Sequence, residues 1–312
     1  MYRYKKNYGF RMSVWVLMIY AFLGFLICAI IGFVSIGVSQ ILYGGSGSAG
    51  VVSMHVIQWS QTLFVMIGAP LLWYRFMAER DQNGRKPSLM DILDEIGLTV
   101  VNWKQFMLTA CLMVVSLPFM DAVESWCLSY LIPDFLSDYV ERELADSVLL
   151  LGGMLQPSGF FGWVELLLLM CVGTAIGEEI MFRGALLSCF RNRCKYHRHM
   201  TAIVVGLIFS AIHMELSGLM PRWILGTLFV YLLYWSHSLW IPILAHFLNN
   251  LTALILYKIT PPEELLSSSR EPSFGWILIL ASLVVTVVLL KAIWDQRVPE
   301  DAEKSQDCTE IS

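Results

Sequence analysis

Residues 160–190 read FFGWVELLLLMCVGTAIGEEIMFRGALLSCF, and this stretch decides the fold class. A helix that crosses a bilayer needs about 20 mainly apolar residues, and this stretch is longer than that. Its second half nevertheless carries Glu178, Glu179 and Arg183. Because charged groups are costly in the hydrocarbon region, each of them is a candidate for a functional role. The stretch therefore predicts a membrane-spanning helix that carries chemistry.

The composition of the whole chain agrees with a membrane protein. Of its 312 residues, 57% are hydrophobic and 15% are charged, whereas soluble proteins average roughly 25% charged. The net charge of -4 favours no nucleic-acid partner. The seven cysteines contain no CxxC pair and most lie in apolar stretches, so they read as small apolar fillers.

Similar apolar stretches recur along the chain and predict an all-α, polytopic bundle of about eight transmembrane helices. The first stretch is too long for a cleaved signal peptide and reads as a signal anchor that stays in the protein. The expected spans are residues 12–38, 53–76, 105–132, 160–190, 200–216, 222–237, 239–257 and 275–294.

The distribution of Lys and Arg predicts the orientation. These residues gather before the first span, after the second, after the fourth and after the eighth. An eight-span arrangement puts all four groups on one side of the membrane. By the positive-inside rule, both termini are expected in the cytoplasm, and the expected location is the plasma (inner) membrane.

Four regions are expected along the chain. The first contains a cytoplasmic loop and a short amphipathic helix near 88–97 that would lie on the membrane surface. The flexible Gly/Ser stretch 44–48 separates its first two spans. The regions are 1–159 with the N-terminal spans, 160–257 with a catalytic helical core, 258–295 with the last span, and 296–312 with a disordered acidic tail.

The first polar cluster contains two neighbouring acids that are expected to have different surroundings. Glu179 and Arg183 are four residues apart, so they share one helix face and can form an ion pair. Glu178 is turned by about 100° and is expected to have no local cation. Such an acid suits a general base. The alternative is a structural salt bridge beside an acid that reaches toward the headgroups.

Two later spans each add a polar motif. Phe209 precedes His213 by four residues, and His246 precedes Asn250 by four. The alternatives are a hydrogen-bonded core histidine and interhelical polar contacts. Straight helices rising about 1.5 Å per residue would place Glu178 and these polar residues at roughly 10–20 Å from the cytoplasmic helix ends. This shared depth favours one common site.

These three motifs, in this order, resemble the CPBP family of CAAX proteases and bacteriocin-processing enzymes. The family pattern is EExxxR, then FxxxH, then HxxxN, and the resemblance covers residues 160–257. The family often has FxxxGxxxG between its two histidine motifs. Gly226 fits the middle position here, but Arg222 and Val230 occupy the flanking ones.

The resemblance implies a glutamate-dependent intramembrane endopeptidase acting on membrane-associated peptides or proteins, including lipidated, CAAX-like or signal-peptide substrates. Glu178 would activate a water molecule with help from His213, and His246 with Asn250 would stabilise the oxyanion. The supporting residues would be Glu179 and Arg183, which orient Glu178, and Phe209.

Zinc is a further option, because some family members are described as metalloproteases. Glu178, His213 and His246 would then be the ligands. The HExxH motif is absent, so we favour metal-independent water activation and commit to no cofactor.

Two other functions compete with the protease. One is a non-catalytic immunity or scaffold membrane protein. The other, less favoured, is a transporter, since the sequence shows neither inverted repeats nor paired broken helices.

Overall fold

The computed structural model describes residues 13–43, 47–78, 84–155, 157, 159–190, 196–260 and 271–297. These residues form helices and connecting turns, with no β-strand among them, so the predicted all-α class is confirmed. The predicted acidic tail falls outside the described residues except for Gln296 and Arg297. Residues 44–46 of the predicted Gly/Ser loop also fall outside, and a helix has already begun at Gly47.

The apolar helices identify an integral membrane protein. Among the described residues, five helices are long and apolar enough to cross a bilayer, and a bent pair would make a sixth. The predicted fifth and sixth spans are the shorter helix Arg198–Ala211 and α12 (Leu219–Ser236). The five long helices are Val14–Tyr43, Gly50–Met77, Gly159–Cys189, Trp240–Ile259 and Trp276–Asp295.

One predicted span is bent. Helices α5 (Trp103–Val115) and α6 (Leu117–Tyr130) meet at an angle of 46°. The break falls at Ser116, just before Pro118 in the first turn of α6. Proline has no amide hydrogen and disfavours a helical residue before it, so it is a common cause of such bends. Hydropathy predicted this segment as a single span over residues 105–132.

The described helices fall into two compact units. The first unit comprises Met1–Val100, Val164–Arg191 and Ser238–Trp240. The second unit comprises Val101–Trp163, Asn192–His237 and Ile241–Ser312.

The first unit is built on helices that contain π-helical segments. One long helix runs through α2 (Gly47–Ser60), η1 (Gln61–Gly68) and α3 (Ala69–Met77). The other runs through η3 (Leu167–Gly173), α9 (Thr174–Glu179), η4 (Ile180–Leu186) and α10 (Leu187–Cys189). Helix α1 (Val14–Tyr43) packs against α2, η1 and α3, and α9 packs against η1. Large apolar side chains such as Trp15, Phe33 and Ile41 remain exposed, as expected for lipid-facing positions.

The short amphipathic helix predicted near 88–97 is present as α4 (Leu89–Glu95). Ser88 and Asp91 form a capping box in which each side chain binds the backbone amide of the other residue. Ile92 is buried, whereas Leu89 and Met90 are exposed. Its position on the membrane surface stays a prediction.

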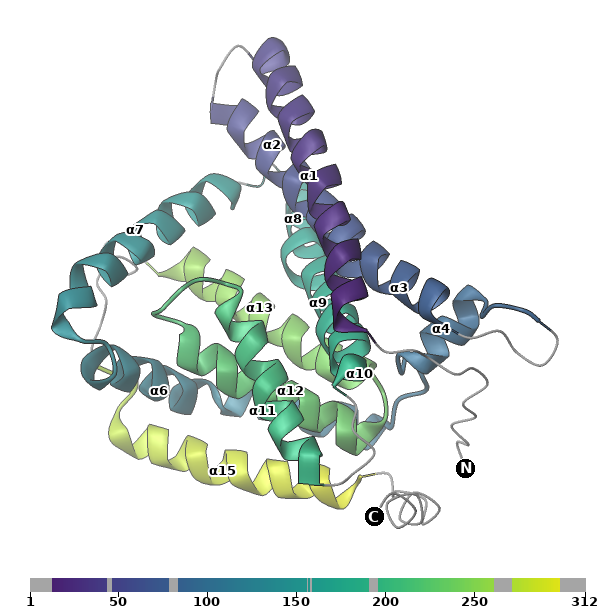
Figure 1. The fold of residues 1–312 in the computed structure, drawn as a ribbon. Helices are drawn as coiled ribbons and strands as arrows, with labels where there is room; N and C mark the ends of the chain where they lie inside the picture. The colour runs from purple at the N-terminus through teal and green to yellow at the C-terminus, as the bar shows by residue number, and fades with distance from the viewer. Residues whose placement is uncertain are drawn as a thin grey trace. The chain divides into compact units, whose positions relative to one another are not determined.

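The core of the second unit joins α5, α12, α13 (Trp240–Ile259) and α15 (Trp276–Asp295), shown in blue, green and yellow in Figure 1. Helix α11 (Tyr196–Ala211) packs along α12. The buried apolar side chains are those of Leu112, Met113, Leu225, Phe229, Leu232, Ile241, Ala245 and Ile293.

Two further features of the second unit extend the sequence analysis. The connection between the third and fourth predicted spans contains an 18-residue helix, α7 (Ser137–Met154), which hydropathy did not indicate. The C-terminal ends of α12 and α15 meet in an aromatic cluster, where the rings of Trp235 and Trp294 lie 5.6 Å apart. The Arg297 guanidinium lies 4.1 Å from the Trp294 ring centre. Aromatic and cationic side chains of this kind mark membrane–water interfaces.

Candidate active site

The predicted site residues are divided between the two units. Glu178, Glu179 and Arg183 belong to the first unit, whereas the residues of the two histidine motifs belong to the second. That all of them share one depth in the membrane stays a prediction.

The predicted ion pair is present in the first unit. The Arg183 guanidinium donates to Glu179 Oε1 at 2.8 Å, and both side chains have no exposed surface. Arg183 also interacts electrostatically with Glu178, so the expectation that Glu178 has no cation nearby is wrong. The two acids still differ, because Glu179 is fully buried and Glu178 only partly.

The backbone after Glu179 is fixed by a buried tyrosine. The π-helical segment η4 starts at Ile180, and π-helical turns occur often at functional sites because they alter the regular backbone hydrogen bonding. The Gly184 carbonyl accepts hydrogen bonds from Tyr74 Oη at 2.9 Å and from Ser188 Oγ at 2.7 Å. Since Tyr74 comes from α3 and is fully buried, it ties this segment to a neighbouring helix.

Gly177 sets the rotation of the helix that carries the two acids. A Cβ atom at this position would lie 2.9 Å from Met66 Cβ and 3.3 Å from Thr62 Cγ2. Only glycine allows α9 to approach η1 this closely. The contact therefore holds the following residue, Glu178, at a defined position on the helix.

In the second unit, the Phe209 ring connects the two histidines. Its centre lies 5.1 Å from the His213 ring and 5.8 Å from the His246 ring, both in edge-on geometry. The centre of the Phe229 ring lies 5.6 Å from that of the His246 ring. The two histidine motifs therefore meet around one aromatic side chain, although they are distant in sequence.

His213 lies in a turn and not in a helix. The predicted span 200–216 ends at Ala211, five residues early. The amide of His213 donates to the Ser210 carbonyl, whereas in a continued helix it would donate to Phe209. The His213 Nδ1 atom takes that place and lies 2.8 Å from the Phe209 oxygen.

This contact fixes the protonation pattern of the imidazole. A carbonyl oxygen only accepts hydrogen bonds, so His213 Nδ1 must carry the hydrogen. In the neutral ring the lone pair is then on Nε2. A histidine with this tautomer can accept a proton or a hydrogen bond from water through Nε2, which is the role expected for His213.

His246 and Asn250 lie one turn apart on α13. His246 is almost fully buried, with 4% of its surface exposed, and its ring contacts those of Phe209 and Phe229. The Asn249 side-chain amide nitrogen lies 3.5 Å from Asn250 Oδ1, a weak hydrogen bond. The expected pair of polar groups on one helix face is therefore present.

Close helix packing exists despite the departure from the family's glycine pattern. A Cβ atom at Gly226 would lie 3.0 Å from Phe209 Cδ1 and 3.1 Å from the Gly206 Cα. Gly206 on α11 thus provides the second small residue at this crossing. Phe209 therefore packs at the crossing of α11 and α12. The close approach of these helices is present although Arg222 and Val230 stand at the other two positions of the family's pattern.

A zinc site would need three or more ligating side chains close together. Within each unit, the described His, Cys, Asp and Glu side chains form no group of three that could hold a metal ion. Zinc-bound histidines often donate a hydrogen bond from the nitrogen that does not bind the metal to a backbone carbonyl, as His213 Nδ1 does here. Two histidines and a glutamate are also ligands that zinc commonly uses. His213 therefore fits either role.

The comparisons with known proteins agree with the motifs. Residues 160–252 match the model of the family described as Type II CAAX prenyl endopeptidase Rce1-like. No curated protein and no solved structure matches the chain. The matched segment carries the pattern of the CAAX-type (CPBP) endopeptidases, which confirms the resemblance.

Sequence reasoning missed several residues that shape the site. Tyr74 lies in an apolar span and carries no charge, so only its hydroxyl group could have pointed to it. Phe229 looks like any other core residue. Gly206 lies three residues before Phe209, and the small residues of the two adjacent helices could have suggested a close crossing.

Proposed function

We propose that this protein is an intramembrane endopeptidase that hydrolyses peptide bonds in membrane-associated substrates through a water molecule activated by Glu178. The substrates would be lipidated, CAAX-like or signal-peptide-like chains. The main observation in support is the His213–Phe209–His246 cluster, in which His213 can accept a hydrogen bond or a proton through Nε2. The match of residues 160–252 to CAAX-type endopeptidases supports the same reading.

The proposed reaction begins with proton transfer from water to the Glu178 carboxylate. His213 Nε2 accepts the other water hydrogen in a hydrogen bond and so orients the water lone pair. The oxygen forms a bond to the carbonyl carbon of the substrate, and the carbonyl electrons move to its oxygen. His246 and Asn250 donate hydrogen bonds to that oxyanion.

Collapse of this intermediate completes the hydrolysis. The carbonyl re-forms as the C–N bond breaks, and the proton held by Glu178 passes to the leaving nitrogen. The buried Glu179–Arg183 pair and the close contact at Gly177 keep Glu178 in place during both steps. Fixed groups of this kind reduce the barrier because they need no reorganisation.

The topology is part of the proposal. Residues 160–257 would form the catalytic core, 1–159 and 258–295 the surrounding spans, and 296–312 an acidic tail. Both termini would face the cytoplasm at the plasma (inner) membrane. The aromatic and cationic cluster around Trp294 supports an interface at the end of α15.

The test is peptidase activity of purified protein in detergent. Wild type, Glu178→Gln and the control Glu165→Gln would be compared on a library of labelled prenylated and unmodified peptides. Glu165 lies in the same long helical segment and interacts with His55 at 3.1 Å, so it controls for loss of a membrane acid. We expect Glu178→Gln to reduce kcat by about 10²–10⁴-fold, the usual contribution of general acid–base catalysis.

Two results would contradict the proposal. One is full activity of folded Glu178→Gln. The other is a wild type that cleaves nothing across the library, which would favour a non-catalytic immunity or scaffold role.

A further inference from the structure

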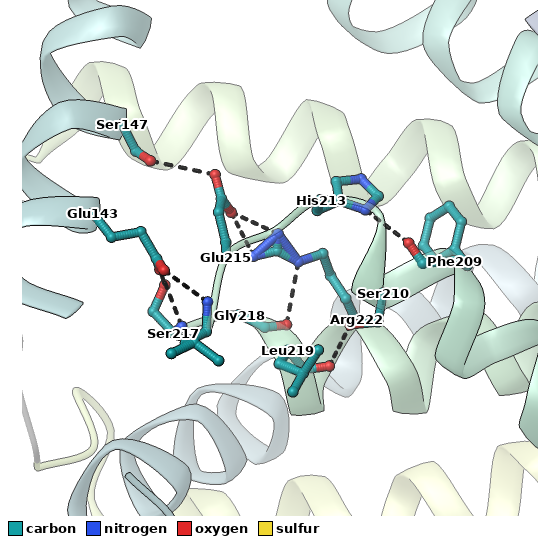
Figure 2. A network of polar contacts seen from close by, with 11 residues as sticks. Glu143, Ser147, Phe209, Ser210, His213, Glu215, Ser217, Gly218, Leu219 and Arg222 are labelled. Carbon is teal, nitrogen blue, oxygen red and sulfur yellow. Dashed lines mark hydrogen bonds and ion pairs between the residues drawn. The ribbon is translucent and has the colours of Figure 1, made fainter. Parts of the chain in front are cut away.

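The loop after His213 is held by a carboxylate from another part of the second unit (Figure 2). Glu143 on α7 accepts hydrogen bonds from the backbone amides of Leu216 at 2.9 Å and Ser217 at 3.2 Å. It also accepts one from Ser217 Oγ at 2.9 Å. Three bonds to one charged acceptor form a strong anchor, because charge-assisted bonds are about twice as strong as neutral ones.

A second set of contacts closes the same loop (Figure 2). Arg222 Nη1 donates to Glu215 at 2.6 Å, and Arg222 Nε donates to the Gly218 carbonyl at 3.2 Å. Ser147 on α7 donates to the other Glu215 oxygen at 3.3 Å. A Cβ atom at Gly218 would lie 2.6 Å from Arg222 Cζ, so glycine makes the room for the guanidinium.

The loop conformation needs this support. Met214 follows His213 directly and has a φ of 54°, in the left-handed region that costs about 1–2 kcal/mol for an L residue. Its side chain is 81% exposed and gives no burial in return. Such a conformation persists only when its surroundings fix it, and the bonds to Leu216 and Ser217 are close enough in sequence to do so.

The other end of α7 is tied to the helix that carries His246. Tyr257 Oη donates to the Val148 carbonyl at 3.1 Å, and Lys258 Nζ donates to the Leu155 carbonyl. Helix α7 therefore connects the loop that follows one histidine with the helix that carries the other.

We propose that Glu143 is a positioning residue for His213, and that α7 holds the His213 turn in the geometry that the reaction needs. This inference rests on the proposed function. Glu143 touches no reacting atom. It acts on the backbone at Leu216 and Ser217, which keeps the turn closed and keeps the His213 Nδ1 atom at the Phe209 carbonyl.

The experiment compares Glu143→Ala and Glu143→Gln with the control Glu141→Ala. Glu141 lies on the same helix and is exposed. With Glu143→Ala we expect kcat to fall about 10–100-fold with little change in KM, because a positioning residue for His213 acts on the chemical step. Glu143→Gln keeps one acceptor oxygen and should be intermediate, and Glu141→Ala should match wild type.

Two measurements do not depend on activity. Hydrogen exchange of the Leu216 and Ser217 amides should be about tenfold faster in Glu143→Ala. Nitrogen NMR of labelled histidines, assigned with a His213→Asn variant, should show His213 changing from one tautomer to a mixture. Loss of stability alone would not change the tautomer of the folded fraction.

The outcomes separate this inference from the proposed function. An active wild type with unchanged kcat and His213 tautomer in Glu143→Ala would overturn the inference and leave the protease intact. If Glu143→Ala does not fold, unchanged kcat and tautomer in Glu143→Gln would overturn it equally. If wild type and Glu178→Gln are both inactive, the protease proposal fails, and the positioning role falls with it.

Discussion

Replacing Gly206 with alanine should push apart α11 and α12, whose crossing positions the Phe209 ring of the histidine cluster. The added Cβ would lie 2.6 Å from the Thr227 backbone nitrogen, whereas ordinary contact begins at 3.4 Å. The Thr227 Oγ1 atom lies nearer still and could rotate away, but the backbone nitrogen could not, so side-chain rotation cannot relieve the clash. Helix α11 must move from α12 by about 0.8 Å, the difference between these two distances.

The size of the effect follows from this displacement. Overpacking of a buried contact typically costs about 1–3 kcal/mol, and a backbone clash belongs at the upper end of that range. Phe209 lies one turn after Gly206 and touches both histidine rings. Misplacement of catalytic groups by about 1 Å can reduce turnover about 100-fold, so kcat should fall well beyond the loss of folded protein.

The assay combines a denaturant titration in detergent with kcat on the best peptide substrate. Gly153→Ala in α7 is the matched control, because no atom lies within 4 Å of its added Cβ. Since alanine is the better helix former, this control should gain up to about 1 kcal/mol. A Gly206→Ala protein with unchanged unfolding free energy and kcat would refute the claim that this crossing sets the geometry of the cluster.

Four further predictions concern the buried ion pair, the turn after His213, the cap of α4 and metal dependence. Arg183→Met should destabilise the protein by about 3–5 kcal/mol in a denaturant titration, because the buried Glu179 charge loses its cation; a loss below 1 kcal/mol would contradict this. Met214→Gly should raise the unfolding free energy by about 0.5–1 kcal/mol, since glycine tolerates positive φ, and a decrease would show that Met214 is not strained. Ser88→Ala should increase hydrogen exchange in α4 by about fivefold through loss of a cap worth about 1 kcal/mol, and unchanged exchange would argue against the capping box. Chelation should leave peptidase activity intact; stoichiometric zinc with chelator-sensitive activity would instead make Glu178 and the histidines ligands.

Hydropathy was sufficient to place the apolar helices but not their irregularities. Hydropathy did not predict helix α7, because acids such as Glu143 lower the mean hydropathy of this segment. The π-helical segments have no sequence signature, since they depend on how neighbouring helices pack. The bend before Pro118 could have been predicted, because proline within an apolar helical run commonly marks one.

The motifs identified the residues of the candidate site but not their local geometry. The spacing of Glu179 and Arg183 was enough for their ion pair, since both lie on one helix. The end of α11 at Ala211 could not be read from hydropathy, because Ile212 and Met214 continue the apolar run. The contacts of Phe209 depend on the crossing of separate helices, which sequence spacing does not encode.

The hydrogen bond that selects the His213 tautomer uses a main-chain oxygen, which every amino acid carries. No codon change at position 209 can remove this acceptor, although the ring can be lost. Insertion or deletion of one residue between 209 and 213 would instead move the imidazole out of reach. The tautomer therefore depends on the number of residues between positions 209 and 213. Natural variants of this turn should differ in the residues between these positions more often than in their number.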